Sequence, residues 1–313
     1  MKHILKTIFC LLAVCCVQAW AAGAGHAEAL LWSISKNGEP AGYLAGTLHA
    51  GKDERLPEGL QTAVGDSRTL VVETLSVDPE YYQQRPEKMP EFLAAIVAEK
   101  SLAEGLGREK AERLHQLLAE SPLTAAMAPL FAPDNRIGLW FAALMTGYTG
   151  LPQDYLGAYG ADGLLLKRAK RAGKAVYGLE DDVQTMRLLS ALPDSAAVAM
   201  IDFALEHREK ISANGKKMVE AYGRGDAAAL WQIYLDGWQD DLLMPPSERA
   251  AVRHFIDRIL LAQRNRNWLP EINRRLAEGR PLIAVGALHL LGSDGLVRLL
   301  REQGWTLEPV KWQ

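Results

Sequence analysis

Two short apolar runs near opposite ends of this chain close on the same pattern, a glycine followed three residues later by a histidine. The first copy is Gly46-Thr47-Leu48-His49 and the second is Gly286-Ala287-Leu288-His289. Each leads to a further glycine, Gly51 or Gly292, that would permit a turn after the histidine. The glycine that opens each copy would allow a close approach of backbone or ligand. A fold that brings the ends of both runs together would place two imidazoles at one spot.

Carboxylates occupy comparable places in two other apolar runs, which carry Glu73 and Glu180. In open α/β sheets, ligands gather outside the carboxyl ends of the strands. We therefore expect His49, Glu73, Glu180 and His289 to converge in one crevice. Two histidines and a carboxylate are enough to hold a catalytic divalent metal with one position left open.

Structural alternatives exist for each of these residues. An isolated buried charge is very costly, so Glu73 must be metal-bound, hydrogen-bonded or paired, and its structural alternative is an ion pair with an arginine. Glu180 could instead be a helix N-terminal acid before Val183. A single histidine at a strand end usually satisfies a hydrogen bond and nothing more. His289 precedes a helix expected to begin near Ser293, whose positive end would favour the neutral imidazole that a metal needs.

The pattern of apolar residues predicts an α/β fold, with a central mixed sheet flanked by helices and a large helical insertion. The expected strands are 30–35, 42–48, 69–75, 174–180, 281–288 and 305–310, and the expected helices outside the insertion are 58–67, 159–172 and about 293–304. Asn37-Gly38 predicts a hairpin between the first two strands. Helical patterns fill about 79–158 and 183–275, and 212–225 is expected to be a charged, exposed hinge.

The first 24 residues have a different character from the rest. Lys2 and Lys6 precede or flank an apolar run, and small residues follow it. This pattern predicts a secretory signal peptide that is cleaved somewhere in 19–24, and residues 25–313 are then one exported domain. A membrane anchor is the alternative, but the run is shorter than the roughly 20 residues that span a bilayer. A membrane contact is therefore expected only through an uncleaved signal segment.

All three cysteines lie in this leading segment. The remaining chain can form neither a disulfide nor a thiolate zinc site, and a cysteine-free exported chain suits a bacterial periplasm. Lipid attachment at Cys15 or Cys16 is the less favoured alternative, because the residues before them do not fit a lipobox. The formal net charge of -3 over 313 residues shows no basic footprint for nucleic acid.

Several segments together resemble the TraB/GumN family, whose distant relatives include the Tiki metalloproteases and the erythromycin esterase-like and ChaN-like proteins. The matching segments are 46–49, the strand with Glu73, Tyr159-Gly160-Ala161-Asp162, 173–174, 178–180, Arg266-Asn267, 285–292 and 304–305. The resemblance implies an α/β core built from two related halves. It also implies a divalent metal, manganese or cobalt by preference and zinc as a possibility, held by His49, His289 and Glu73.

By the same resemblance, Arg266 would face the site and could stabilise an oxyanion. Its alternative is a surface arginine in the run Arg264–Asn267. The predicted function is an exported, metal-dependent hydrolase of amide, peptide or ester bonds that acts on a peptide or small molecule. Glu73 would be a ligand or the general base, and Glu180 the reserve carboxylate.

The rival prediction is a non-catalytic binding protein that sequesters a peptide or a haem-like ligand in the same crevice. Tyr148, Tyr155 and His49 are the side chains that a haem could use. The residues leave both functions open, together with the oligomeric state and the identity of the metal.

Overall fold

A six-stranded mixed sheet forms the centre of the computed structural model, which describes residues 29–78, 80–240 and 243–313. The strand order is β4-β3-β5-β2-β1-β6. The strands are β1 Leu31–Lys36, β2 Glu39–Thr47, β3 Thr69–Val72, β4 Ala175–Gly178, β5 Pro281–Gly286 and β6 Thr306–Pro309. Neighbours among β4, β3, β5 and β2 are parallel, whereas β1 is antiparallel to both β2 and β6. The predicted mixed α/β sheet is confirmed.

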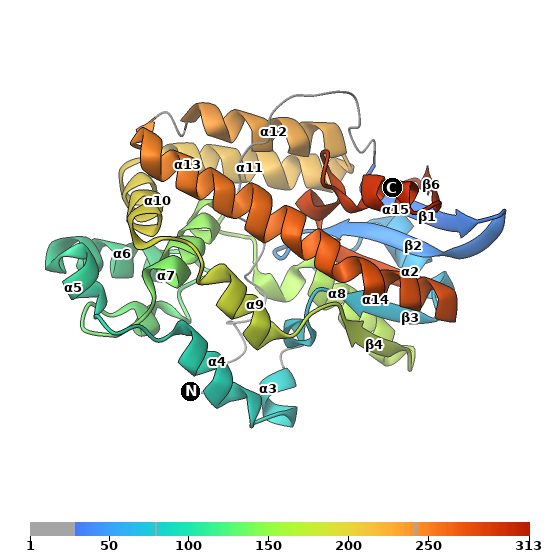
Figure 1. Cartoon of the computed structure of the whole chain (residues 1–313), viewed down its shortest axis with the longest axis horizontal. Coiled ribbons are helices and arrows are strands. Elements are labelled where there is room, and N and C mark those ends of the chain that lie inside the picture. The colour runs from blue at the N-terminus through green and yellow to red at the C-terminus, as the bar shows by residue number, and fades with distance from the viewer. Residues whose placement is uncertain (1–28, 79, 241–242) are drawn as a thin grey trace.

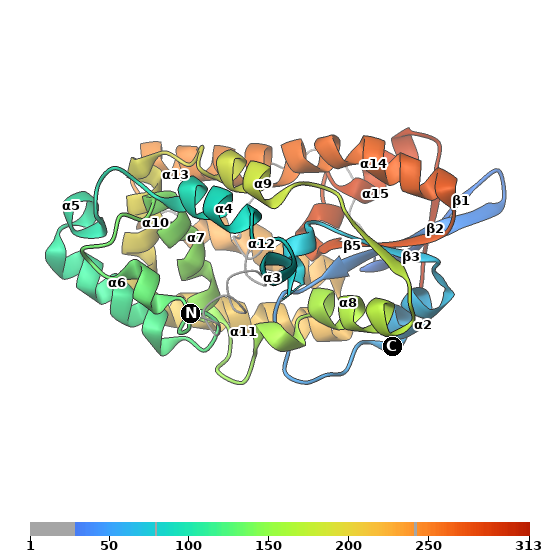
Figure 2. The ribbon, with the colours of Figure 1, turned by 90° about the horizontal axis from the view of Figure 1, so that it is seen from below.

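Helices cover both faces of this sheet (Figure 2). On one face lie α2 Glu58–Asp66 and α8 Ala161–Arg171, and on the other lie α14 Arg264–Glu278 and α15 Leu296–Glu302. Strand β5 is buried along its whole length, as expected for a parallel strand with helices on both sides. The hairpin between β1 and β2 turns at Asn37 and Gly38, which both have positive φ, as the Asn-Gly pair predicts.

The remaining helices gather beyond the end of the sheet at which the parallel strands finish (Figures 1 and 2). Between β3 and β4 these are α3 Tyr81–Gln84, α4 Lys88–Ile96, α5 Leu102–Leu106, α6 Arg108–Glu120 and α7 Leu139–Thr146. Between β4 and β5 they are α9 Asp182–Leu189, α10 Asp194–Glu206, α11 Arg208–Arg224, α12 Ala227–Asp240 and α13 Pro246–His254. The helical insertion thus lies next to the strand ends.

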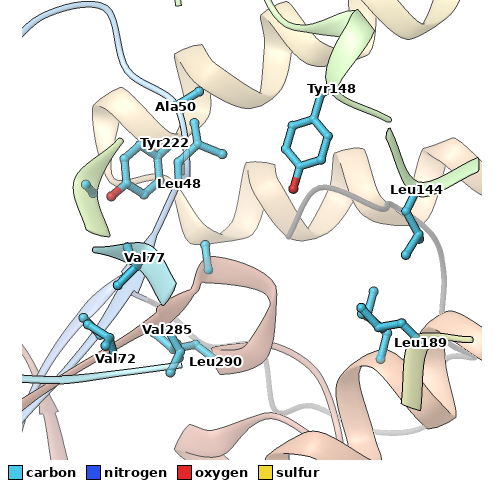
Figure 3. Packing of buried hydrophobic residues seen from close by; sticks show 14 of the residues in the cluster. Leu48, Ala50, Val72, Val77, Leu144, Tyr148, Leu189, Tyr222, Val285 and Leu290 are labelled. Carbon is cyan, nitrogen blue, oxygen red and sulfur yellow. The ribbon is translucent and has the colours of Figure 1, made fainter. Parts of the chain in front are cut away.

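Short helices of other types complete the chain. The 3-10 helices are η1 Leu75–Val77, η2 Ala128–Phe131, η3 Gly147–Gly150, η4 Gly157–Tyr159 and η7 Ala287–Leu290. A π-helix, η6 Phe255–Gln263, joins α13 to α14. Apolar side chains pack at the carboxyl ends of the strands, where Val72, Val285 and Leu290 are buried (Figure 3).

Three local predictions need correction. The expected hinge at 212–225 instead forms most of the continuous helix α11, and Gly225 ends that helix in the left-handed conformation. The strand predicted over 281–288 stops at Gly286, so His289 lies in η7. The last helix begins at Leu296, after an N-cap at Gly295, rather than near Ser293.

The predicted signal peptide lies outside the described residues. Within the part of the chain that the structure describes, no single helix is long and apolar enough to cross a membrane. Helices α9 and α10 together are long and apolar enough for a membrane span by length and composition only, but the chain bends by 89° between them.

Candidate functional site

The sheet brings the ends of four parallel strands side by side. Thr47 at the end of β2 is paired with Gly286 at the end of β5, and Val72 at the end of β3 is paired with both Ala284 of β5 and Gly178 of β4. The predicted residues follow these ends: His49 after β2, Glu73 after β3, Glu180 after β4 and His289 after β5.

His49 is oriented by a carboxylate to which the sequence had given no role. Its Nδ1 lies 2.6 Å from Oδ2 of Asp162, and Thr47 donates its hydroxyl proton to Oδ1 of the same carboxylate at 2.6 Å. A carboxylate only accepts hydrogen bonds, so the Nδ1 of His49 carries the proton and, in the neutral ring, Nε2 carries the lone pair. This Nε2 is buried and has no hydrogen-bond partner among the described residues.

The surroundings of His49 raise its pKa. Burial is the largest single influence and lowers the pKa. The charge and hydrogen bond of Asp162 act in the opposite direction, and with Glu73 they outweigh both burial and the charge of Arg264, so the pKa lies above its usual 6.5.

Two glycines bring Asp162 to His49. The position of a Cβ on Gly160 would lie 2.5 Å from the carbonyl oxygen of His49, and one on Gly51 would lie 2.0 Å from the carbonyl oxygen of Tyr159. The backbone segments therefore touch where only glycine fits. Gly51 was expected to make a turn, but it does not have a positive φ, and the close contact explains it instead. The Gly51–Leu156 backbone pairing holds the same two segments together.

Arg264, the first residue of α14, joins the other predicted residues into one buried cluster. Its Nη2 donates to Oε2 of Glu73 and to Oε1 of Glu180, both at 2.5 Å, and its Nη1 lies 3.2 Å from Nε2 of His289. The side chain of Arg264 is only 2% exposed. The structural alternative for Glu73, an ion pair with an arginine, is therefore the arrangement present, and Glu180 belongs to the same ion pair.

Glu73 has both carboxylate oxygens engaged. The backbone N–H of Gly286 donates to Oε1 at 2.6 Å, while Oε2 accepts from Arg264. Burial alone would raise its pKa, but the charges of Arg264, His289 and His49 lower it to about 2. Glu180 is fixed in a similar way, because Trp268 donates its indole N–H to Oε2 at 2.9 Å.

His289 is held by an amide rather than a carboxylate. Asn265 donates through Nδ2 to the carbonyl oxygens of His289 and Asp294, at 3.0 and 2.8 Å, so its Oδ1 accepts from the Nδ1 of His289 at 2.7 Å. Nε2 is then the acceptor that faces Arg264. Burial, followed by the charge of Arg264, outweighs the attraction of Glu73 and lowers the pKa of His289 to about 3.

The neutral ring expected for His289 is thus present for a different reason. Sequence reasoning assigned it to the positive end of the following helix, but that helix begins only at Leu296. Burial is the dominant cause of the lowered pKa, and the charge of Arg264 acts in the same direction.

Arg266, by contrast, does not join the cluster. Its side chain is 53% exposed and forms an ion pair with Asp294. The alternative of a surface arginine describes it correctly, and Arg264, two residues earlier in the same run, takes the place in the site that Arg266 was expected to occupy.

The predicted metal ligands do not fit a metal as they are arranged. Glu73 and the Nε2 of His289 are both engaged by Arg264, which leaves the Nε2 of His49 as the open donor of the three. Among the described residues, no group of three histidine, cysteine, aspartate or glutamate side chains is placed to hold a metal ion. A metal at all three ligands would require Arg264 to move away.

Two cavities are lined by residues that neighbour the cluster in the sequence, and not by members of the cluster itself. One, of about 540 Å³, includes Ala50, Gly51, Tyr159, Ala161 and Tyr222 in its lining and adjoins the His49 side; we call it the Tyr159 cavity. The other, of about 350 Å³, adjoins the His289 side through Asn265 and Leu288 and is lined by Trp231; we call it the Trp231 cavity. Figure 3 shows Tyr222 close to Leu48 and Ala50.

Comparison with known proteins places the chain in a family. The model of the TraB/PrgY/gumN family matches residues 30–309. The chain belongs to this family. It is 26% identical over 274 residues to the uncharacterised protein YbaP of Shigella flexneri, covering 86% of this chain and 90% of the relative. It is also 26% identical over 265 residues to YbaP of Escherichia coli K12, covering 83% and 87%. No solved structure matches the chain.

Two central residues of this TraB-family site received no role from the sequence. Asp162 lies in the segment Tyr159–Asp162 and is buried in the first turn of a helix, a place where an aspartate reads as an ordinary helix-start acid. Arg264 lies in a polar run at a helix start. The signal that could have found it is the charge balance, because a buried Glu73 demands a buried cation.

Proposed function

We propose that this TraB-family protein is a hydrolase of amide or ester bonds in which His49 is the general base. The observation that supports this most is the contrast within one ring: Nδ1 is held by Asp162, while Nε2 has an open lone pair. A base oriented by a buried carboxylate is the arrangement that removes a proton from a water or hydroxyl nucleophile. A pKa above 6.5 makes His49 a stronger base than a free histidine.

Arg264 supplies the positive charge of the proposed site. It is near enough to His49 for its charge to lower the pKa of that ring. When water attacks a carbonyl carbon, negative charge develops on the carbonyl oxygen, and a fixed buried cation stabilises that charge more than it stabilises the neutral substrate. We propose this role for Arg264 in place of Arg266.

Glu73 and Glu180 then hold Arg264 in position. A carboxylate with a pKa of about 2 and both oxygens hydrogen-bonded is a poor general base near neutral pH. Of the roles predicted for Glu73, the geometry therefore favours neither, and support of the guanidinium replaces them in this proposal.

The predicted manganese, cobalt or zinc ion stays a prediction. We route no step through it, because two of its three expected ligands are engaged by Arg264. Calorimetric titration of the chelator-free protein with each metal tests it. Binding that disappears in the double variant His49→Ala, His289→Ala would establish the site.

The hydrolase proposal is tested with a library of peptides and chromogenic esters, assayed with chelator and again with added manganese. We expect turnover, and we expect His49→Ala to lower kcat/KM by about 10²–10⁴-fold, the usual contribution of a general base. A second variant, Arg264→Ala, should remove activity. Its matched control is Arg266→Ala, in the same run of the sequence, which should retain activity. Turnover that survives His49→Ala would overturn the assignment of the base.

A non-catalytic binding protein for a peptide or haem-like ligand is the opposing outcome of the same experiment. It would be indicated by tight binding of library peptides, or by a haem absorbance band with added haemin, without any turnover. Export is part of the proposal and rests on the sequence of residues 1–24. Mass spectrometry of the protein isolated from cells tests it, and an intact Met1 to Trp20 segment would contradict it.

A further inference from the structure

The Trp231 cavity lies between α12, the π-helix η6 and the segment that follows His289. Its lining includes Trp231, Tyr234, Asp257, Arg258, Gly292 and Asp294. Its volume of about 350 Å³ lies in the range of cavities that take small molecules, roughly 300–1,000 Å³. The lining combines aromatic and aliphatic side chains with charges of both signs.

Stacked aromatic rings form one wall of this cavity. The rings of Trp231 and Tyr234 lie 4.8 Å apart with 26° between their planes. Gly292, the glycine that follows the second histidine, provides the seat for Trp231: it has φ +74°, and a Cβ there would lie 2.5 Å from Cη2 of the indole. A side chain at residue 292 would push the indole from its place, so this glycine shapes the cavity.

Opposite charges face the same space. Asp257 accepts a hydrogen bond from the hydroxyl of Tyr234 at 2.7 Å and feels the positive charges of Arg253 and Arg258. Arg258, whose side chain is 64% exposed, lies 3.8 Å from Asp294. Two carboxylates and two guanidinium groups around one small cavity make it neutral overall but strongly dipolar. A ligand that carries either charge alone would leave part of this arrangement unmatched, whereas a zwitterion matches both.

The backbone beside the cavity is a π-helix, which favours a functional site over an incidental void in the packing. The π-helix η6 covers Phe255–Gln263 and leads directly into Arg264 and Asn265. Segments of π-helix are rare and occur frequently at functional sites. Here the π-helix contributes Asp257, Arg258 and Leu261 to the cavity.

We propose that the Trp231 cavity binds an α-amino acid with an aromatic or long aliphatic side chain, recognised as a zwitterion. Its ammonium group pairs with Asp257, its carboxylate pairs with Arg258, and its side chain packs against Trp231. The binding does not depend on hydrolysis. A free amino acid and a dipeptide share this chemistry, and the size of the ligand distinguishes them.

The protonation of Asp257 gives this proposal an additional readout. Burial raises the pKa of Asp257 to about 6, against the lowering effects of Tyr234, Arg253 and Arg258, while Asp294 adds to the increase. A bound ammonium would lower that pKa again, so binding near pH 6 should release protons. The calorimetric heat should therefore depend on the ionisation enthalpy of the buffer.

The experiment is calorimetric titration of the whole protein with L-phenylalanine, L-leucine and the dipeptide Phe-Phe, and with N-acetylphenylalaninamide, which lacks both charges. We expect phenylalanine to bind at least about tenfold more tightly than the uncharged analogue. Trp231→Ala, Asp257→Asn and Arg258→Ala should each weaken binding by about tenfold. A dipeptide that binds more tightly than either amino acid would identify the peptide as the better ligand.

The matched control is Lys52→Ala, which changes an exposed cation of the Tyr159 cavity and should leave binding unaltered. His49→Ala should also bind normally, so that loss of the proposed hydrolysis and loss of this site are distinguishable. The proposal is overturned if neither amino acid nor the dipeptide binds at about 10 mM, or if the three cavity variants bind phenylalanine as tightly as the unaltered protein does.

Discussion

His49 and His289 follow neighbouring parallel strands and close matching tetrapeptides, yet their surroundings are opposite in character. A carboxylate, Asp162, holds the Nδ1 of His49, whereas an amide, Asn265, holds that of His289. The Nε2 of His49 has no partner in the described part of the chain, and that of His289 faces the guanidinium of Arg264. The pKa is raised in one ring and lowered to about 3 in the other.

The difference shows that a repeated motif fixes where a histidine lies but not what it can do. The backbone supplies the position, and one partner on each nitrogen sets the protonation state. In this family member, the ring of His49 is suited to accept a proton. The ring of His289 stays neutral and faces the guanidinium of Arg264.

The largest expected effect is the loss of stability on removing Arg264, the residue whose guanidinium faces His289 and binds Glu73 and Glu180. Arg264→Ala would leave Glu73 and Glu180 buried without their cation, and breaking a buried ion pair in this way costs about 3–5 kcal/mol. Chemical denaturation measures the change. Arg266→Ala, which removes an exposed pair with Asp294, should change stability by less than about 1 kcal/mol. Equal losses in the two variants would contradict the buried cluster.

Asp162→Asn should make the surroundings of His49 resemble those of His289, because an amide would then hold the Nδ1 of each ring. Without the carboxylate, the pKa of His49 falls, because burial and Arg264 then act with less opposition. Any hydrolytic kcat/KM should drop by about 10²-fold or more. Proton NMR titration of the histidine rings follows the pKa directly, even if no substrate is found. The exposed carboxylate Asp53 offers the control, and Asp53→Asn should leave the titration of His49 in place.

Gly160→Ala should separate His49 from Asp162 without changing either side chain. The new Cβ would lie 2.5 Å from the carbonyl oxygen of His49, so the two segments must move apart, at about 1–3 kcal/mol. At Gly163, in the helix that carries Asp162, nothing beyond the local helix backbone lies within 4 Å of the Cβ position. Gly163→Ala should therefore stabilise the helix by about 0.5–1 kcal/mol. Thermal unfolding of the pair checks the prediction, which fails if both variants change stability in the same direction.

The two histidines should also differ in how the free energy of unfolding depends on pH. The folded pKa of His289 lies below the unfolded value of about 6.5, so its contribution is complete above pH 6.5 and is lost as the pH falls towards 3, by at most about 1.4 kcal/mol per pH unit. His49, with a raised folded pKa, contributes below pH 6.5 and loses that contribution as the pH rises through its folded pKa.

Denaturation between pH 4.5 and 9 separates the two histidines from Glu73, whose lowered pKa acts below about 4.5. His289→Gln should flatten the acidic side of the profile, and His49→Gln should flatten the alkaline side. If His289→Gln flattened the alkaline side and His49→Gln the acidic side, the pKa directions given for the two histidines would be contradicted.

Much of the fold was predictable because it follows local periodicity. The apolar runs that end near Thr47, Val72, Gly178 and Gly286 gave the strands, and parallel pairing then brought their ends together. The boundaries that failed depend on tertiary contacts. The stretch predicted as a hinge stays helical in α11, where its buried face includes Met218 and Val219.

The site was predictable to a lesser degree. Residues in a repeated motif or an apolar run, such as His49 and Glu73, attract notice in one sequence. Asp162 and Arg264 do not, because Asp162 is a common helix-start acid and Arg264 lies in an ordinary polar run, and each acquires its role only through burial. Choosing between Arg264 and Arg266 requires knowing which face of the helix is buried against the strand ends, and a polar run of residues does not show this.

The ion pair of Arg264 also bears on how this chain reaches its native state. Glu73 is 191 positions away from Arg264 in the sequence, and Glu180 is 84. Bringing such distant partners together closes long loops of chain, and non-local contacts of this kind slow folding. Until these partners meet, the three charges must stay hydrated, which opposes early collapse around them. We therefore expect the buried cluster around Arg264 to be among the last parts of the molecule to assemble.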